Sequence, residues 1–377
     1  MAIKDTPHMN IGPGEFIKEE LEVRNWRQED LAEILGISLK SVNQLIKNKQ
    51  TITIETAKLL SKAFGQSPQY WINLDSNYRL RLQEDNRQAK DAEIKGMIYK
   101  YMPVTGMVKK GWLSAFHNSR ELIDQVYNFW NINKLDFTFL DDAELPTFRK
   151  SDVFAQYNKY YALTWFRMAQ TSAQNYSAGQ YERDNLRQLS DDLYSYTVKT
   201  NGIELFLNEF SNAGVKFFVL SHLQKTYIDG ASFWDKSNPV IVYSGRYNRI
   251  DNFWFTIAHE IAHILLHLKK KTDYFIDDLD NISSNVEKEA NQYATKMLRA
   301  NEITAYFKHF GKYISEKRVV DCSKELNVSP AIVVGVLHHQ GLLSRRNLNR
   351  YKEKVLDFIP ETFLVEKRFK QKLRRTK

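Results

Sequence analysis

The chain has 377 residues, of which 43% are hydrophobic and 26% charged, as expected for a globular protein of two or three domains. The single cysteine excludes an internal disulfide framework, and neither a secretion leader nor an apolar run of about 20 residues is visible, so we expect a soluble, cytoplasmic protein. Of the net charge of +9, twelve Lys/Arg against four acidic residues place +8 between 345 and 377, which predicts a basic C-terminal tail, either solvated or in contact with phosphates.

Residues 10–83 contain short helical patterns separated by turn signals. The segments EFIKEELEVR (15–24), RQEDLAEIL (27–35) and SLKSVNQLIKN (38–48) each place apolar residues on one side, and a fourth helix follows before Gly65. Gly36 suits the C-terminal end of a helix, and Ser38 suits the N-terminal cap of the next one. Two short helices joined by a turn that contains glycine predict a helix-turn-helix motif.

The outward side of segment 38–48 carries Lys40, Asn43, Gln44 and Lys47, and Lys49 follows it. Asparagine and glutamine can bond adenine edges, and lysine can reach guanine or phosphate. No acidic residue lies between 33 and 55, which favours approach to a polyanion. The alternative is a polar helix face that is only solvated.

The stretch from 9 to 80 resembles the HigA-type antitoxins of the Cro/C1 class. The shared residues are Pro13-Gly14-Glu15, Asp30-Leu31-Ala32, Gly36, Thr53, Glu55-Thr56-Ala57 and Trp71. The resemblance implies a homodimer on a two-fold double-stranded DNA operator, with Gln28 near a phosphate. One departure is Arg27, which stands where the pattern has a capping Ser or Thr, so the next helix is expected to lack its side-chain cap.

Residues 86–202 are predicted to form a helical connecting region, polar and aromatic, without recognisable chemistry. Three short strands are predicted next, in VKFFVL (215–220), in KTYIDGASFW (225–234) with an Asp229-Gly230 turn signal, and in PVIVYS (239–244). Long helices return from 252. The predicted fold class is therefore mainly α (α+β), with an all-α domain at 10–83 and a small sheet farther along the chain.

Residues 253–268 read FWFTIAHEIAHILLHL, an apolar helix that contains His259, Glu260, His263 and His267. Ionisable groups are costly to bury unless they are paired or bind a metal. His259 and His263 lie one turn apart on one helix face, where two imidazoles can bind one zinc ion. Glu260 points away from that pair and is suited to act as the general base of a metal-dependent hydrolysis.

A third metal ligand is expected from the helix VEKEANQYATKML (286–298). Its apolar stripe consists of Val286, Ala290, Tyr293 and Met297. Glu287 and Glu289 flank that stripe on opposite sides, so helical spacing leaves both open.

The segments NPVIVYSGRYNRIDNFWFTIAHEIAHILLHL and EKEANQYATKML resemble the ImmA/IrrE metallopeptidases, over about 203–343. The resemblance implies a zincin-like domain in which the glutamate directly before Ala-Asn is a ligand, so Zn²⁺ would be bound by His259, His263 and Glu289. His267 is expected to contact a ligand or to pack, unless it closes the site as a fourth ligand.

Two features stay open. The group that stabilises the oxyanion is left undecided among Tyr293, Tyr313, His338 and His339. The segments KTYIDGASFW and PVIVYS either offer a sheet edge to an extended substrate or are ordinary core strands.

The sequence thus predicts an antitoxin-like, DNA-binding transcriptional regulator with a zinc-dependent endopeptidase domain that cleaves a repressor or a partner protein. One alternative is a non-catalytic antitoxin or repressor whose metallopeptidase-like domain is structural or binds a toxin. Another is an enzyme whose N-terminal domain recognises only proteins.

Overall fold

The computed structural model describes residues 10–82, 87–143, 157–277, 285–308, 310 and 313–367. The chain divides into two compact units, 1–96 and 97–377. The described residues form mostly helices together with one small mixed sheet, which confirms the predicted fold class. No helix in this described part of the chain combines the length and the apolar character needed to cross a membrane.

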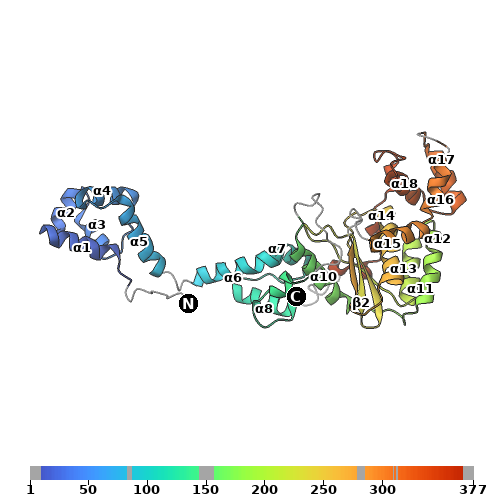
Figure 1. Cartoon of the computed structure of the whole chain (residues 1–377), viewed down its shortest axis with the longest axis horizontal. Coiled ribbons are helices and arrows are strands. Elements are labelled where there is room, and N and C mark those ends of the chain that lie inside the picture. The colour runs from blue at the N-terminus through green and yellow to red at the C-terminus, as the bar shows by residue number, and fades with distance from the viewer. Residues whose placement is uncertain are drawn as a thin grey trace. The chain divides into compact units, whose positions relative to one another are not determined.

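The first unit is a bundle of short helices (blue in Figure 1). The helices are α1 (Pro13–Arg24), α2 (Gln28–Leu35), α3 (Leu39–Ile46), α4 (Ile54–Phe64) and α5 (Pro68–Leu82). Their apolar sides meet in one core around Ile17, Leu31, Val42, Leu60 and Trp71, all fully buried. Each predicted helix of this region therefore forms, with its apolar face inward.

The turn between α2 and α3 forms as the sequence predicts. Gly36 ends α2 in the left-handed conformation, at φ 64°. The hydroxyl of Ser38 accepts the main-chain N–H of Ser41 at 3.1 Å and so caps α3. Arg27 supplies no side-chain cap to α2, as expected, but the carboxylate of Asp30 accepts the Arg27 N–H at 2.6 Å, which satisfies the main chain at this helix start.

Helix α6 (Arg87–Tyr101) spans the boundary between the units, and the second unit holds the remaining helices. These are α7 (Val104–Lys110), α8 (Ser119–Trp130), α9 (Thr138–Asp141), α10 (Lys159–Ala173), α11 (Arg183–Asp191), α12 (Leu193–Tyr196), α13 (Gly202–Asn212), α14 (Ile250–Ala262), α15 (Asn285–Met297), α16 (Ala300–Phe307), α17 (Glu316–Leu326) and α18 (Pro330–His339). A π-helical turn, η2 (His263–His267), continues α14, and three 3₁₀ turns follow α18: η3 (Asn349–Tyr351), η4 (Val355–Asp357) and η5 (Glu361–Phe363).

The sheet has the strand order β1-β3-β2-β4. The strands are β1 (Lys216–Val219), β2 (Gly230–Asp235), β3 (Asn238–Tyr243) and β4 (Tyr274–Asp277). β1 runs parallel to β3, and the β2–β3 and β2–β4 pairs are antiparallel. The three predicted strands form, although β2 begins only at the glycine of the turn signal; β4 was not predicted.

The strand order decides between the two alternatives left open for PVIVYS and KTYIDGASFW, in favour of core strands. β3 lies between β1 and β2, and β2 lies between β3 and β4. The strands in PVIVYS and KTYIDGASFW are thus both internal and offer no edge to a substrate. The outer strands of the sheet, within the described residues, are β1 and β4.

Helices cover both faces of the sheet (Figure 1). The ring of Phe166 in α10 packs against Phe233 of β2 and Tyr274 of β4, at centroid distances of 5.2 and 4.7 Å. Helices α13 and α14 pack on the opposite face with Phe217 and Ile241 in one core. Helix α10 lies within the predicted helical connecting region 86–202, and it covers one face of the sheet.

The described part of the predicted basic tail is anchored to the second unit by apolar residues, while most of its basic side chains are exposed. Val355 is fully buried and Ile359 nearly so, both in the main core of the unit. The main-chain N–H of Ile250, at the start of α14, donates to the carbonyl of Glu353 at 3.1 Å, and Leu364 bridges to the end of β1. Apolar residues between the charges anchor this segment; residues 368–377 lie outside the described residues.

Candidate metal centre and DNA-binding surface

Helix α14 and the turn that follows it bury three ionisable side chains completely. His259, Glu260 and His263 each have 0% of their surface exposed. The surrounding apolar residues of α14, such as Phe253 and Ile257, are equally buried against the sheet and neighbouring helices. Burial of this kind requires partners for the polar atoms.

The two imidazoles converge with a carboxylate from α15. The Nε2 atoms of His259 and His263 lie 3.0 Å apart. Glu287 places Oε2 3.1 Å from His259 Nε2 and Oε1 3.7 Å from His263 Nε2. Two ligands that each lie about 2.0–2.1 Å from a tetrahedral zinc ion are separated by about 3.3–3.4 Å. Two neutral imidazoles and a carboxylate at this spacing fit a zinc ion.

Glu287, rather than the expected Glu289, lies beside the two imidazoles. Helix α15 turns Glu287 inward together with Ala290, Ala294 and Met297, and Glu287 is only 4% exposed. The side chain of Glu289 is 63% exposed and does not join the cluster. The buried side of α15 thus contains Glu287 and Ala294 in place of the predicted Val286 and Tyr293. The packing of α15 against α14 decides which side of the helix faces inward.

A second set of contacts involves the Nδ1 atoms of the two imidazoles, whose Nε2 atoms face the cluster. The Oδ1 atom of Asn291 lies 3.1 Å from His259 Nδ1, and His267 Nδ1 lies 3.1 Å from His263 Nδ1. Glu289 Oε2 lies 3.2 Å from His267 Nε2. Burial lowers the pKa of His267, which favours the neutral form of this imidazole. His267 faces the side of His263 that points away from the cluster, which does not suit a fourth ligand.

The carboxylate of Glu260 lies against the first residue of β2. A Cβ atom on Gly230 would lie 2.2 Å from Glu260 Oε1 and 2.9 Å from Thr256 Cγ2. Only a residue without a side chain leaves room here for the carboxylate. Strand β2 and helix α14 thus hold Glu260 in a narrow space.

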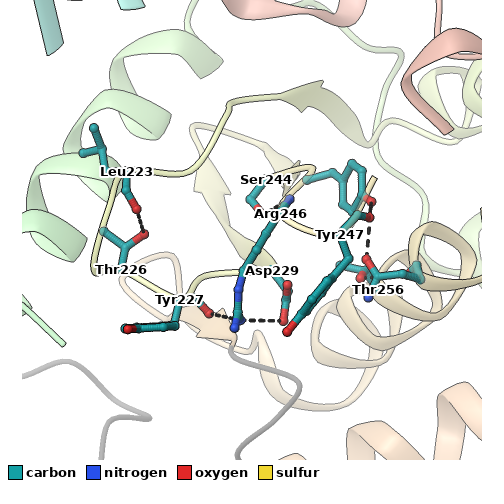
Figure 2. A network of polar contacts seen from close by, with 10 residues as sticks. Leu223, Thr226, Tyr227, Asp229, Ser244, Arg246, Tyr247 and Thr256 are labelled. Carbon is teal, nitrogen blue, oxygen red and sulfur yellow. Dashed lines mark hydrogen bonds and ion pairs between the residues drawn. The ribbon is translucent and has the colours of Figure 1, made fainter. Parts of the chain in front are cut away.

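A polar network fixes the chain just before Gly230 (Figure 2). The guanidinium of Arg246 donates to the Tyr227 carbonyl at 2.8 Å, pairs with the buried carboxylate of Asp229 at 3.4 Å, and lies over the rings of Tyr227 and Tyr247. Tyr227 has φ 54°, a conformation that non-glycine residues rarely adopt and that its surroundings must hold. No sequence motif marks this network, which positions the start of β2 beside Glu260.

The four candidates for oxyanion stabilisation lie in different surroundings. His338 Nε2 is hydrogen-bonded to the main-chain carbonyl of residue 347 at 3.1 Å. Tyr313 is 86% exposed, His339 packs near Phe255, and Tyr293 packs against the main core. These contacts do not select one of them.

The helix-turn-helix unit presents the predicted DNA-binding side chains on its surface. Lys40, Lys47 and Lys49 are exposed, and Asn43 and Gln44 are partly exposed, while the opposite side of α3 is buried. Gln28, the first residue of α2, is partly exposed. In helix-turn-helix motifs the second helix enters the major groove, and here the exposed side of α3 carries amides and lysines.

Two family models match the chain. One, described as helix-turn-helix, matches residues 17–71, and one described as an IrrE N-terminal-like domain matches residues 210–335. The first match begins within α1, contains α2 to α4 and ends within α5, and the second contains the sheet, α14 and α15. Each unit of the chain is therefore similar to a different family.

Several curated relatives match the N-terminal part. Virulence-associated protein I of Dichelobacter nodosus is 32% identical over 80 residues, which cover 21% of this chain and 74% of that protein. An uncharacterized HTH-type transcriptional regulator of Haemophilus influenzae is 31% identical over 91 residues, 23% of this chain and 85% of that protein. The uncharacterized HTH-type transcriptional regulator YddM of Escherichia coli is 34% identical over 68 residues, 18% of this chain and 72% of that protein.

These matches show similarity to helix-turn-helix regulators in general, and they do not distinguish the HigA type from other types. The chain belongs to the helix-turn-helix transcriptional regulators, and it joins a DNA-binding domain of that family to an IrrE N-terminal-like domain.

Proposed function

We propose that this regulator binds Zn²⁺ through His259, His263 and Glu287 and uses Glu260 to hydrolyse a peptide bond in a repressor or partner protein. The observation that carries the proposal is the convergence of three buried donor groups next to a further buried carboxylate. Such a set of groups is costly to bury in a protein that makes no use of them.

The donor set suits a catalytic rather than a closed zinc site. Three protein ligands leave the fourth tetrahedral position for water or substrate. Zinc, when bound, polarises the scissile carbonyl and lowers the pKa of water. His267 contacts the Nδ1 atom of His263, so it leaves that fourth position open.

Glu260 performs the proton transfers. Its carboxylate accepts a proton from the attacking water as the new C–O bond forms, and it returns that proton to the leaving amine as the C–N bond breaks. Gly230 and the Arg246 network hold the strand against this carboxylate, which limits the positions that Glu260 can take.

The edge strand β4 offers a binding place for an extended substrate. Phe275 of β4 stacks on the ring of His263, with centroids 4.4 Å apart and an interplanar angle of 16°. β4 pairs on one side with β2, and no strand within the described ranges pairs with its other side. An extended peptide that forms main-chain hydrogen bonds with β4 would pass beside the metal centre.

The N-terminal unit supplies operator recognition. Asn43 and Gln44 would bond base edges, with Lys40, Lys47 and Lys49 reaching guanine or phosphate and Gln28 contacting a phosphate. We propose that two copies bind a two-fold operator, because the two half-sites of such DNA require two recognition helices. The cleaved protein would be this chain, a sister copy, another repressor or a toxin partner, so that proteolysis changes operator occupancy.

The second candidate is an antitoxin-like repressor whose metal centre is structural or holds a toxin. The proteins that match the N-terminal part favour it. The matched part makes up most of their own length but only about a fifth of this chain, so those proteins have little room for a second domain like the one here. Glu260 separates the two candidates, because a structural metal centre has no need of a buried carboxylate outside its ligand set.

The test combines cleavage and DNA binding. The purified chain is loaded with zinc and incubated with itself and with neighbouring gene products, and fragments are identified by mass spectrometry. We expect cleavage at discrete sites, lost in Glu260→Gln, and a shift of the chain's own promoter DNA by both proteins. A zinc-loaded chain that shifts DNA but cuts no candidate would favour the second candidate.

A further inference from the structure

The Nδ1 atoms of His259 and His263, which point away from the candidate metal centre, each lie within hydrogen-bond distance of another side chain. His259 Nδ1 lies 3.1 Å from Asn291 Oδ1, and His263 Nδ1 lies 3.1 Å from His267 Nδ1. The chain of contacts continues from His267 Nε2 to the carboxylate of Glu289 at 3.2 Å. Helix α15 therefore contributes three polar side chains around the centre: Glu287, Glu289 and Asn291. Of these three, only Glu287 faces the Nε2 atoms of the two imidazoles.

The hydrogen-bond chemistry of these partners assigns the protons. A carboxylate oxygen accepts, so His267 Nε2 carries the proton that it donates to Glu289. A neutral imidazole that donates through Nε2 accepts through Nδ1, so the Nδ1 of His263 must be the donor in the next contact. The Nε2 of His263 then keeps its lone pair, which points toward the metal centre.

The π-helical turn η2 builds this contact. The main-chain N–H of Leu268 donates to the carbonyl of His263 at 2.8 Å, a bond across five residues instead of four. The wider turn follows directly on α14 and carries His263 at its start and His267 at its end. Single π turns inside helices frequently occur at functional sites, where they reposition a side chain.

We propose that His267 and Glu289 are a positioning pair that fixes the tautomer and ring orientation of His263 for metal binding. This inference rests on the proposed zinc centre and adds that Glu289 acts through His267 rather than on the metal. Removing a hydrogen-bonded partner of a metal-binding histidine typically weakens metal affinity by about 10–100-fold.

The test measures zinc affinity by competition with a chromophoric chelator in the wild type and in a set of variants. His267→Phe keeps an aromatic ring beside Phe275 but removes both nitrogens, and Glu289→Ala removes the carboxylate from an exposed position. We expect affinity to fall about 10–100-fold in both. Glu289→Gln, whose amide oxygen still accepts, should bind zinc nearly as well as the wild type. Lys288→Ala, an exposed truncation on the same helix, should bind as the wild type does.

A second readout is the histidine ¹⁵N spectrum of the zinc-loaded chain. We expect His263 to carry its proton on Nδ1 and His267 on Nε2, and we expect the His267 assignment to be lost in Glu289→Ala. Zinc binding as tight as that of the wild type in His267→Phe and Glu289→Ala, or a His267 that carries its proton on Nδ1, would overturn the inference alone. A wild-type chain that binds no zinc would overturn the proposed function and the inference with it.

Discussion

Gly230 and Glu260 lie so close that the main chain of β2 forms one wall of the space around the carboxylate. A Cβ atom at Gly230 would stand 2.2 Å from Glu260 Oε1 and 3.0 Å from its Cδ. Both residues are fully or almost fully buried, which leaves the carboxylate little room to move aside.

Gly230→Ala should therefore displace Glu260 and slow peptide cleavage by about 100-fold, since a shift of about 1 Å in a reacting group costs that much. Zinc affinity should stay unchanged, because the ligands are untouched. The matched control is Gly106→Ala, whose Cβ would meet Leu223 at an ordinary 3.6 Å. Undiminished cleavage in Gly230→Ala would show that the carboxylate does not need this position.

Glu260→Gln should reduce the cleavage rate by about 10²–10⁴-fold, the usual contribution of a general acid–base group. The amide has nearly the same shape but accepts no proton, so folding and zinc content should match those of the wild type. Single-turnover kinetics together with metal analysis would check both. Cleavage at the wild-type rate would remove Glu260 from the reaction.

Glu287→Ala should abolish stable zinc binding, because it removes the buried carboxylate proposed as the third ligand. In the wild type, zinc at about 100 times its dissociation constant should stabilise the folded chain by about 2.7 kcal/mol, measured as a rise in thermal midpoint. This rise should vanish in Glu287→Ala and persist in Glu302→Ala, which truncates an exposed glutamate. A zinc-dependent rise in the Glu287 variant would return the third ligand to Glu289.

Asn43→Ala should weaken binding to the preferred operator by about 1–3 kcal/mol and relax base preference at one position. Lys47→Ala should weaken binding to all DNA sequences alike. It should also reduce the slope of log affinity against log salt concentration by about 1. Mobility shifts at several salt concentrations would measure both, with Lys62→Ala at the end of α4 as the control. Equal loss in all three variants would argue against recognition by α3.

Cys322 offers a probe of the second unit. Its side chain is fully buried, and burial raises the pKa of the thiol to about 12. The raised pKa keeps the group as the unreactive thiol at pH 8, because the thiolate is the form that reacts. We expect iodoacetamide to label the native chain slowly and the denatured chain quickly, and zinc to slow labelling further. Rapid labelling of the native chain, or no effect of zinc, would contradict this prediction.

Local signals in the sequence predicted the local structure well. Gly36 and Ser38 end and start helices through their own main-chain conformation and hydrogen bonds, and the spacing of His259 and His263 places both on one helix face whatever surrounds them. The fold class and the helix-turn-helix motif could be predicted for the same reason.

The features that depend on distant parts of the chain could not be predicted. The choice between Glu287 and Glu289 depends on how α15 packs against α14, and periodicity does not contain that information. The short strand β4 forms because β2 pairs with it, and Phe275 then packs on His263. The high charge of residues 345–367 predicted a solvated tail and gave no sign that Val355 and Ile359 are buried. Their burial depends on the rest of the fold.

The hydrogen bond between Ile250 and Glu353 has a consequence for synthesis of the chain. The start of α14 is held by residues that leave the ribosome long after the histidines themselves. The N-terminal unit, in contrast, contains its whole core within the first residues to emerge and can fold as each nascent chain grows. The helix-turn-helix unit can thus be complete before the last contacts around the candidate metal centre can form.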